Sequence, residues 1–370
     1  MISIYSVFDR LGALSKMPLV LITLISSIGF AMLYSAADGS FSPWAYKQMI
    51  RFTVGFVIML AVACTDIRIW MSLSYPIYGL SLLLLIGVEM MGFIGMGAQR
   101  WIDLYVIQLQ PSEIMKIALI LALARYFHLT SLEDIFKLRN LLIPLALIMV
   151  PTVLVMRQPD LGTAMILMMS GAVLFFATGV KLWKFLVAGG SLVAAIPLFW
   201  SMLHDYQRKR VLIFLNPESD PMKSGYHVTQ SKIALGSGGW FGQGFMQGTQ
   251  SHLSFLPEKQ TDFIFTMFSE EFGFLGGCVL VALFIMLLSY GFRIALDSRM
   301  HYARLVALGI NSIFFLYAFI NMSMVMGMLP VVGVPLPLVS YGGTALLTLL
   351  MGQGLIFSAS LYNEARTGRF

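Results

Sequence analysis

The sequence predicts an all-α polytopic membrane protein, and three observations carry that prediction. Hydrophobic residues make up 58% of the 370 residues and charged residues only 11%, whereas a soluble domain carries roughly 25% charged residues. Mean hydropathy is +0.82. The apolar residues also gather into runs long enough to cross a bilayer core about 30 Å thick as helices. This composition excludes a water-soluble globule, and so little charge also excludes a disordered chain.

About ten apolar segments have the length of a membrane-spanning helix. In chain order they are residues 17–35, 47–66, 70–93, 111–129, 139–156, 160–179, 183–203, 263–292, 303–327 and 341–362. No soluble domain separates them, so residues 1–370 are interpreted as a single integral membrane domain.

The basic residues predict the side of the membrane that each loop faces. Thirteen lysines and arginines fall on the side of the N-terminus, whereas the short loops on the other side hold only Lys47, Arg51, Arg100 and Arg157. Because cytoplasmic loops are enriched in Lys and Arg, we expect both termini in the cytoplasm and an even number of spans. Topology and anionic lipid therefore account for the net charge of +6, and no nucleic-acid partner is expected.

One long polar segment, residues 204–262, separates the seventh and eighth predicted helices and is expected outside the cytoplasmic membrane. It gathers many side chains able to do chemistry: His204, Asp205, Arg208, Lys209, Arg210, Lys232, Glu258 and Asp262. Its glycine-dense part, residues 236–244, lacks the Gly-Lys-Ser/Thr ending of a phosphate-binding loop. We expect that part to be a flexible or tightly turned loop.

A second irregular stretch, residues 328–343, is apolar and uncharged but contains three prolines and three glycines. A regular helix cannot continue through it. Irregular backbone at membrane depth is tolerated only against protein or a wet cavity. The stretch is therefore interpreted as a re-entrant or interfacial loop beside a cavity, with an ordinary outer connection as the alternative.

Asp262 is the first candidate for chemistry, because it lies where the polar loop becomes an apolar helix. A carboxylate there is partly desolvated and close to the positive end of a helix dipole. The alternative is a structural N-cap, a common role for aspartate before a helix. Further along that helix, Glu270 is about 80° around the axis from Asp262 and about 12 Å deeper, and Glu271 falls on the opposite face. A close carboxylate pair is not expected, and each glutamate is expected to pair with a neighbouring helix.

Charged residues near other predicted helix ends form a second group of candidates. Glu113 and Lys116 stand at i and i+3 of one helix, so they form a mutual ion pair or line a polar cavity. A set of cations on the outer side suits a phosphate-bearing ligand or, alternatively, anchors the protein to headgroups. Its members are Arg100, Arg157, Arg208, Lys209, Arg210 and Lys232.

Taken together, several motifs resemble the SEDS family of bacterial cell-wall synthesis. They are GAQRWID (97–103), QPSE (110–113), QPDLGT (158–163), QSKIA (230–234), LPE (256–258), TDFIF (261–265) and PLPLVSYGG (335–343). They follow the order of the family and span roughly residues 20–360. HDYQR (204–208) and NPESDP (216–221) resemble the elongation branch of the family more than its division branch.

The resemblance implies ten helices and a peptidoglycan glycosyltransferase that polymerises lipid II, with Asp262 as its essential aspartate. It also implies a functional Glu113–Lys116 salt bridge, a divalent metal ion (Mg or Mn) and a class B penicillin-binding protein as partner, beside other proteins of the elongation complex. Asp160, Glu258 and Thr261 fall within the matching motifs and are expected to line or support the cavity. Gln260 stands where the family often has histidine, which argues against a proton-shuttling role at that position.

The mechanism expected from this resemblance is an inverting glycosyl transfer at the outer face. Asp262 would act as general base or help to hold a metal, and Arg100, Arg208, Arg210 and Lys232 would stabilise the leaving diphosphate. Two alternatives stay open. A flippase for lipid-linked precursors would need essential acids deep in the bundle, around Glu113 or Glu270, and a non-catalytic scaffold would tolerate changes at Asp262.

Overall fold

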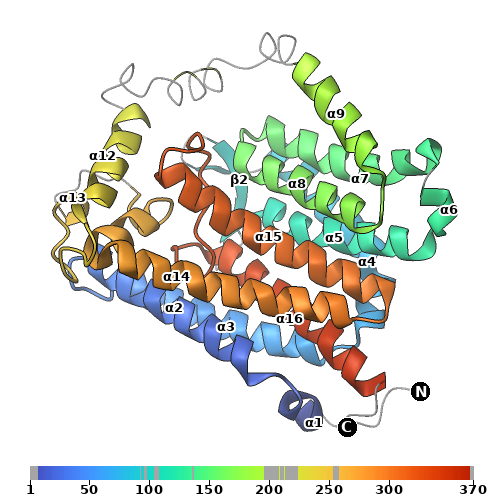
Figure 1. Cartoon of the computed structure of the whole chain (residues 1–370), viewed down its shortest axis with the longest axis horizontal. Coiled ribbons are helices and arrows are strands. Elements are labelled where there is room, and N and C mark those ends of the chain that lie inside the picture. The colour runs from blue at the N-terminus through green and yellow to red at the C-terminus, as the bar shows by residue number, and fades with distance from the viewer. Residues whose placement is uncertain are drawn as a thin grey trace.

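Helices form nearly all of the regular structure (Figure 1). A computed structural model describes residues 7–91, 93–95, 98–103, 108–135, 137–195, 208, 212, 224–252 and 258–366. Its helices are α1 (Val7–Gly12), α2 (Lys16–Ala36), α3 (Ala45–Cys64), α4 (Ile67–Met91), α5 (Pro111–Leu129), α6 (Leu132–Ile135), α7 (Leu138–Arg157), α8 (Leu161–Ala177), α9 (Leu182–Ala194), α12 (Ser224–Ser237), α13 (Thr249–His252), α14 (Ile264–Asp297), α15 (His301–Val325) and α16 (Gly343–Arg366).

Each of the ten predicted apolar segments overlaps one of these helices, and residues 196–203 of the seventh segment lie outside the described part of the chain. Within the described residues, seven helices are long and apolar enough to cross a membrane, namely α2, α3, α4, α7, α14, α15 and α16. Helix α8 is apolar but shorter, and α5 carries charged residues at its first turns. The chain is therefore a multi-pass membrane protein. The number of crossings and the side on which each terminus lies stay predictions.

A small antiparallel sheet corrects the all-α prediction. Its strands β1 (Phe93–Gly95), β2 (Ala98–Asp103) and β3 (Gln108–Leu109) lie in that order between α4 and α5. Phe93 pairs with Trp101, and Ile102 pairs with Leu109. Strands β1 and β3 were missed because they have only three and two residues, and β2 was missed because its six residues, AQRWID, do not alternate between apolar and polar.

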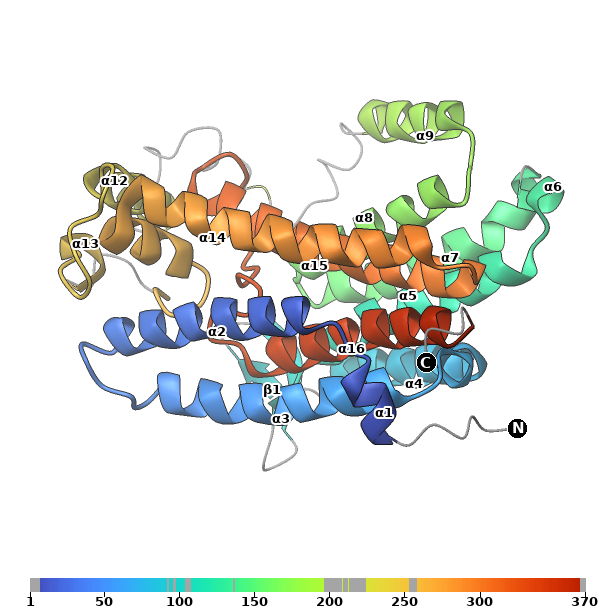
Figure 2. The same ribbon diagram turned by 60° about the horizontal axis from the view of Figure 1, so that its bottom comes forward.

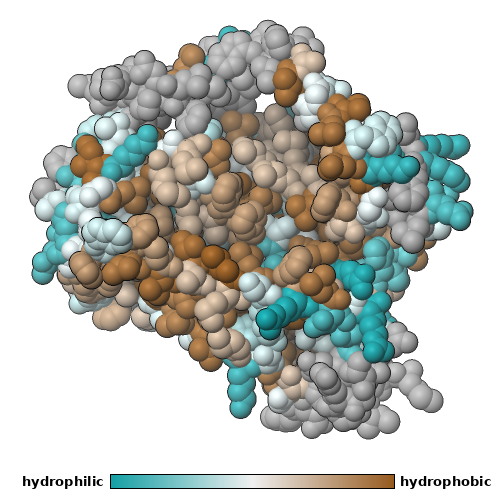
Figure 3. All heavy atoms as spheres, viewed as in Figure 1, coloured by the Kyte–Doolittle hydropathy of each residue, from teal (hydrophilic) through white to brown (hydrophobic). Residues whose placement is uncertain are grey.

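The bundle has two distinct ends and an apolar surface between them. In two views, α1 and the last turns of α16 lie toward one end, and α12 and α13 lie at the other (Figures 1 and 2). The face shown in Figure 3 is brown along its middle, with hydrophilic residues mainly toward its edges. On α14, the side chains of Phe274, Val279, Ile285 and Leu296 are exposed. Such a continuous apolar exterior suits contact with lipid.

Helices α5 and α15 form the centre of the bundle. Most of their side chains are buried, and α5 packs against α4, α7, α8, α15 and α16. Gly309 of α15 permits close approach to α5, because a Cβ at this position would lie 2.6 Å from the Ile120 side chain. Small residues at helix contacts serve this purpose in membrane bundles.

The long predicted loop contains its own structure. Helices α12 and α13 fall within residues 204–262, and the glycine-dense stretch is tightly turned, which is one of the two forms expected for it. Its backbone pairs with α14 where Gly273 adopts a positive φ of 68° and kinks the helix. Gln243 N donates to Glu270 O at 3.0 Å, and Phe274 N donates to Gly239 O at 2.9 Å. The kink releases backbone groups of α14, and the glycine-rich backbone comes close enough to satisfy them.

Candidate functional site

Asp262 lies in the turn that immediately precedes α14. The N-cap of α14 is Phe263, so the N-cap alternative for Asp262 is wrong, and the Asp262 side chain is half-buried. Glu258 organises this turn: its Oε2 atom accepts hydrogen bonds from Gln260 Nε2 and Thr261 Oγ1, each at 3.2 Å. The structure therefore brings Glu258, Thr261 and Asp262 together in one turn.

Neighbouring segments hold the backbone of this turn from outside. Ser340 Oγ donates to Thr261 O at 2.6 Å, and Tyr341 N donates to Gln260 O at 2.9 Å. Asn321 Nδ2, from α15, donates to Asp262 O at 2.9 Å and to Val334 O at 2.7 Å. Because its backbone is fixed on three successive residues, the turn presents the Asp262 carboxylate in a defined direction.

The carboxylate of Asp262 faces the irregular stretch that follows α15. A Cβ at Gly333, whose φ is +71°, would lie 3.4 Å from Asp262 Oδ2. The stretch is buried through Val334 and Val339, and Gly29 of α2 packs directly against Val339. The stretch therefore has the contact with protein that an irregular loop at membrane depth requires, and the choice between a re-entrant loop and an outer connection stays a prediction. A cavity beside the loop stays a prediction.

Glu113 and Lys116 form the predicted ion pair on α5, with Lys116 Nζ 2.7 Å from Glu113 Oε1. Both residues are buried. The Tyr317 hydroxyl of α15 lies 2.8 Å from both carboxylate oxygens and accepts a hydrogen bond from Lys116, and Thr348 of α16 donates to Glu113 Oε2 at 3.3 Å. The pair thus connects three central helices.

Arg100 and Asp160 meet at the turn between α7 and α8. The guanidinium of Arg100, on β2, donates to Gln158 O at 3.0 Å and also to Pro159 O. Asp160 is the N-cap of α8, accepts from Thr163 N at 3.2 Å and receives a hydrogen bond from Gln110 Nε2 at 3.2 Å. In this structure the two residues fix the turn, and their role toward a ligand stays a prediction.

The remaining predicted cations are placed less completely. Lys232 lies on the exposed face of α12, and a Cβ at Gly327 would be 2.6 Å from its Nζ atom. Its neighbour Ser231 fixes α12 to the Asp262 region, as Ser231 Oγ lies 2.7 Å from Thr266 Oγ1 of α14 and donates to Val325 O. Arg208 is described only as a partly buried residue, and Arg210 lies outside the described residues, as do His204, Asp205 and Lys209.

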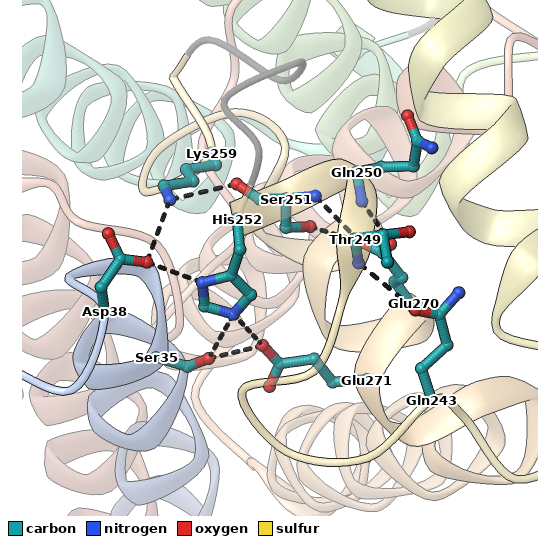
Figure 4. Close-up of polar contacts among 10 residues, drawn as sticks. All are labelled: Ser35, Asp38, Gln243, Thr249, Gln250, Ser251, His252, Lys259, Glu270 and Glu271. Atoms are coloured by element: carbon teal, nitrogen blue, oxygen red, sulfur yellow. Dashed lines mark hydrogen bonds and ion pairs between the residues drawn. The ribbon is translucent and has the colours of Figure 1, made fainter.

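Two groups of polar residues were missed from the sequence. Gln48 and Arg51 of α3 contact the irregular stretch, with Gln48 Nε2 donating to Ser340 O at 2.9 Å and the Arg51 guanidinium 4.8 Å from the Tyr341 ring centroid. The sequence signal that could have revealed them is a polar residue and a basic residue spaced three apart within an apolar segment. The second group surrounds His252 and Glu271 (Figure 4).

The donor set for a divalent metal is small. Within the described part of the chain, no group of three or more His, Cys, Asp or Glu side chains is arranged to hold a metal ion. The turn before α14 nevertheless carries Asp262 and Glu258, and Mg²⁺ is commonly bound through one or two carboxylates together with substrate phosphates. These residues fit a metal that arrives with a phosphate-bearing ligand, rather than one held in an all-protein cage.

Comparisons with known proteins cover almost the whole chain. The family model of the FtsW, RodA and SpoVE cell cycle proteins matches residues 9–365. The chain is 44% identical over 359 residues to the peptidoglycan glycosyltransferase MrdB of Escherichia coli strain K12, covering 96% of each protein. It is 36% identical to stage V sporulation protein E of Bacillus subtilis, covering 94% of this chain and 97% of that protein.

Solved structures agree with this relationship. A chain from a peptidoglycan synthase complex that coordinates polymerization and crosslinking matches with a TM-score of 0.83 and 30% identity, over 96% of this chain and 99% of the other. The rod shape determining protein RodA of Thermus thermophilus matches with a TM-score of 0.71 and 27% identity, over 94% and 97%. The chain described here therefore belongs to the SEDS family of membrane proteins, with a RodA-like fold.

Proposed function

We propose that the chain is a peptidoglycan glycosyltransferase that polymerises lipid II into glycan strands at the outer face of the bacterial cytoplasmic membrane, during cell elongation and rod-shape maintenance. Relatives that carry the name peptidoglycan glycosyltransferase support the activity. The observation that carries the assignment to a site is Asp262, a half-buried carboxylate on a turn whose backbone is held by Asn321, Ser340 and Tyr341.

In the proposed reaction, Asp262 acts as general base. The acceptor hydroxyl forms a bond to the anomeric carbon of the donor with inversion, the bond from that carbon to the lipid diphosphate breaks, and the hydroxyl proton passes to the Asp262 carboxylate. General-base assistance is worth about 10²–10⁴-fold. Because the backbone of the turn is held at three successive residues, the carboxylate is already in place and need not be ordered during the reaction.

The leaving diphosphate gains charge as its bond breaks, so cations must face it. We assign this role to Lys232, which lies beside Gly327 at the start of the irregular stretch, and to Arg100, Arg208 and Arg210. In the alternative to the general-base role, Asp262 would help to hold a divalent ion, which would supply further neutralisation of that charge. Glu113 and Lys116 support the site by fixing α5 against α15 and α16.

We also propose a partner in the membrane. One structural relative comes from a synthase complex that coordinates polymerization with crosslinking. By analogy, a class B penicillin-binding protein would supply the crosslinking step here, beside other proteins of the elongation complex.

The test uses the purified full chain in liposomes that contain lipid II, without any other transferase. Two products are measured: glycan polymer and lipid II moved across the bilayer. Polymer formation supports the proposal. Translocation without new glycosidic bonds would instead identify a flippase, and neither product in the presence of intact partner binding would identify a scaffold.

A further inference from the structure

A cluster of charged residues lies around His252, at the end of α13 (Figure 4). Its Nδ1 atom is 2.6 Å from Asp38 Oδ1, in the turn after α2, and its Nε2 atom is 3.3 Å from Glu271 Oε1 of α14. Nε2 is also 3.5 Å from Ser35 Oγ of α2. Both ring nitrogens therefore face oxygen atoms, from two different elements of the bundle.

A protonated ring can donate to both contacts at once. A neutral imidazole has a single N–H, whereas the imidazolium has two. The Ser35 hydroxyl donates to Glu271 Oε1 at 2.5 Å, the same oxygen that lies 3.3 Å from Nε2. The hydrogen bond with His252 is also the main cause that lowers the pKa of Asp38, with a further contribution from Lys259, so this carboxyl stays ionised opposite the ring.

Two successive glutamates of α14 hold α13 in place through hydrogen bonds. Glu271 contacts His252, and Glu270 caps α13 by accepting from Gln250 N at 2.8 Å, Ser251 N at 3.1 Å and Ser251 Oγ at 2.6 Å. Both glutamates are buried. A carboxylate that accepts backbone N–H groups at a helix N-terminus is held strongly.

Lys259 connects this cluster to the turn that carries Asp262. Its Nζ atom donates to Ser251 O at 3.1 Å and lies 3.9 Å from Asp38 Oδ1. Among the residues drawn in Figure 4, Lys259 is the only cation besides the ring, and three carboxylates accompany it: Asp38, Glu270 and Glu271. Carboxylates therefore outnumber ammonium groups in this cluster.

We infer that His252 is a positioning residue for the proposed polymerase reaction. Its charged ring ties α13 to Asp38 and Glu271, and Lys259 transmits this anchoring to the Asp262 turn. When the ring loses its proton as the pH rises, one of its two N–H donors disappears and the anchoring weakens. Polymer synthesis consequently falls on the alkaline side of its pH profile because of His252. The inference rests on the proposed function but names a residue and a pH dependence beyond it.

The experiment is the pH profile of polymer synthesis from lipid II in liposomes, by the full chain, by three variants of the cluster and by one control variant. His252→Gln keeps only a neutral amide, so kcat falls by about 10- to 100-fold, as expected for a misplaced catalytic group, and the fall with rising pH disappears. His252→Arg keeps a permanent cation and retains synthesis at the pH where the wild type declines.

Asp38→Asn, at an exposed side chain, moves the alkaline fall to lower pH. His128→Gln, at the far end of α5, is the control that leaves the profile in place.

Melting temperatures of every variant at both ends of the pH range separate positioning from unfolding. A wild-type alkaline fall that persists in His252→Gln and His252→Arg overturns the inference, and so does an unmoved profile in Asp38→Asn. Absence of polymer from the wild type at every pH contradicts the proposed function instead, so the two failures are distinguishable.

Discussion

Two buried glutamates of this bundle, Glu113 and Glu271, obtain their partners in different ways. Glu113 is neutralised within its own helix by Lys116 at 2.7 Å and is joined by Tyr317 and Thr348. Glu271 receives Ser35 and His252 from segments far away in the chain, and its Oε2 atom has no hydrogen-bond partner among the described residues.

The two clusters differ in the side chain that faces the carboxylate and in the elements that they connect. The Glu113 cluster joins α5, α15 and α16 through a lysine. The Glu271 cluster joins α2, α13 and α14 through a histidine, and it lies next to the turn that carries Asp262. Only the second cluster carries the pH dependence inferred above, because free histidine changes charge within the physiological pH range and free lysine does not.

The largest effect on stability is expected from Lys116→Met. This change leaves Glu113 buried without its counter-charge, and breaking a buried pair costs about 3–5 kcal/mol in the free energy of unfolding. Thermal unfolding in detergent measures it. Lys137→Met is the matched control, because Lys137 pairs with Asp134 at the same i,i+3 spacing, with side chains 68% and 43% exposed, and exposed pairs contribute little.

A double change sharpens this prediction. Glu113→Leu combined with Lys116→Met removes both charges, and we expect it to recover most of the lost stability, because apolar replacements of buried pairs are often neutral. A melting temperature of Lys116→Met equal to that of the wild type would contradict the prediction, because it would mean that Glu113 is not held as a buried charge.

The next largest effect is expected from Glu270→Ala, which removes the acceptor for Gln250 N, Ser251 N and Ser251 Oγ. Leaving buried donors unpaired costs about 1–3 kcal/mol. Hydrogen exchange at the amides of α13 reports the loss locally. Protection equal to the wild type would show that α13 is held by other contacts.

Ser340→Ala is expected to destabilise the chain by about 2 kcal/mol, because it removes two hydrogen bonds with a typical net value of about 1 kcal/mol each. It removes the bond to Thr261 O and the one from Leu336 N. The Asp262 turn would lose one of its anchors, so kcat should fall with little change in KM. A change confined to KM would instead place Ser340 in ground-state substrate binding.

The smallest effect concerns Asp38 at acidic pH. Its pKa is lowered in the folded chain, mainly by the hydrogen bond with His252. A depressed carboxyl pKa contributes stability above its unfolded value, and that contribution is lost as the pH falls through the folded value. The difference in melting temperature between the wild type and Asp38→Asn should therefore vanish on acidification. A difference that grows instead would contradict the assigned contact.

The sequence predicted the local features well. Apolar length located a helix in each of the ten segments, and the three-residue spacing of Glu113 and Lys116 predicted their ion pair. Both depend only on neighbouring residues. The motif at Asp262 located a turn that the structure shows to be held from several sides.

Features made by distant residues could not be predicted. The expectation that Glu271 pairs with a neighbouring helix is confirmed by Ser35, but His252 and Asp38, which are 214 residues apart, gave no sequence signal of their contact. The backbone pairing between the glycine-dense stretch and the kink of α14 at Gly273 likewise gave no sequence signal.

The most direct test of Asp262 as the general base is the rate of glycan synthesis by Asp262→Asn in partner-free liposomes. The amide keeps the shape of the side chain but accepts no proton. We therefore expect kcat to fall by about 10²–10⁴-fold, with an unchanged melting temperature. A kcat within a few-fold of the wild type would contradict the assignment of Asp262 as the general base.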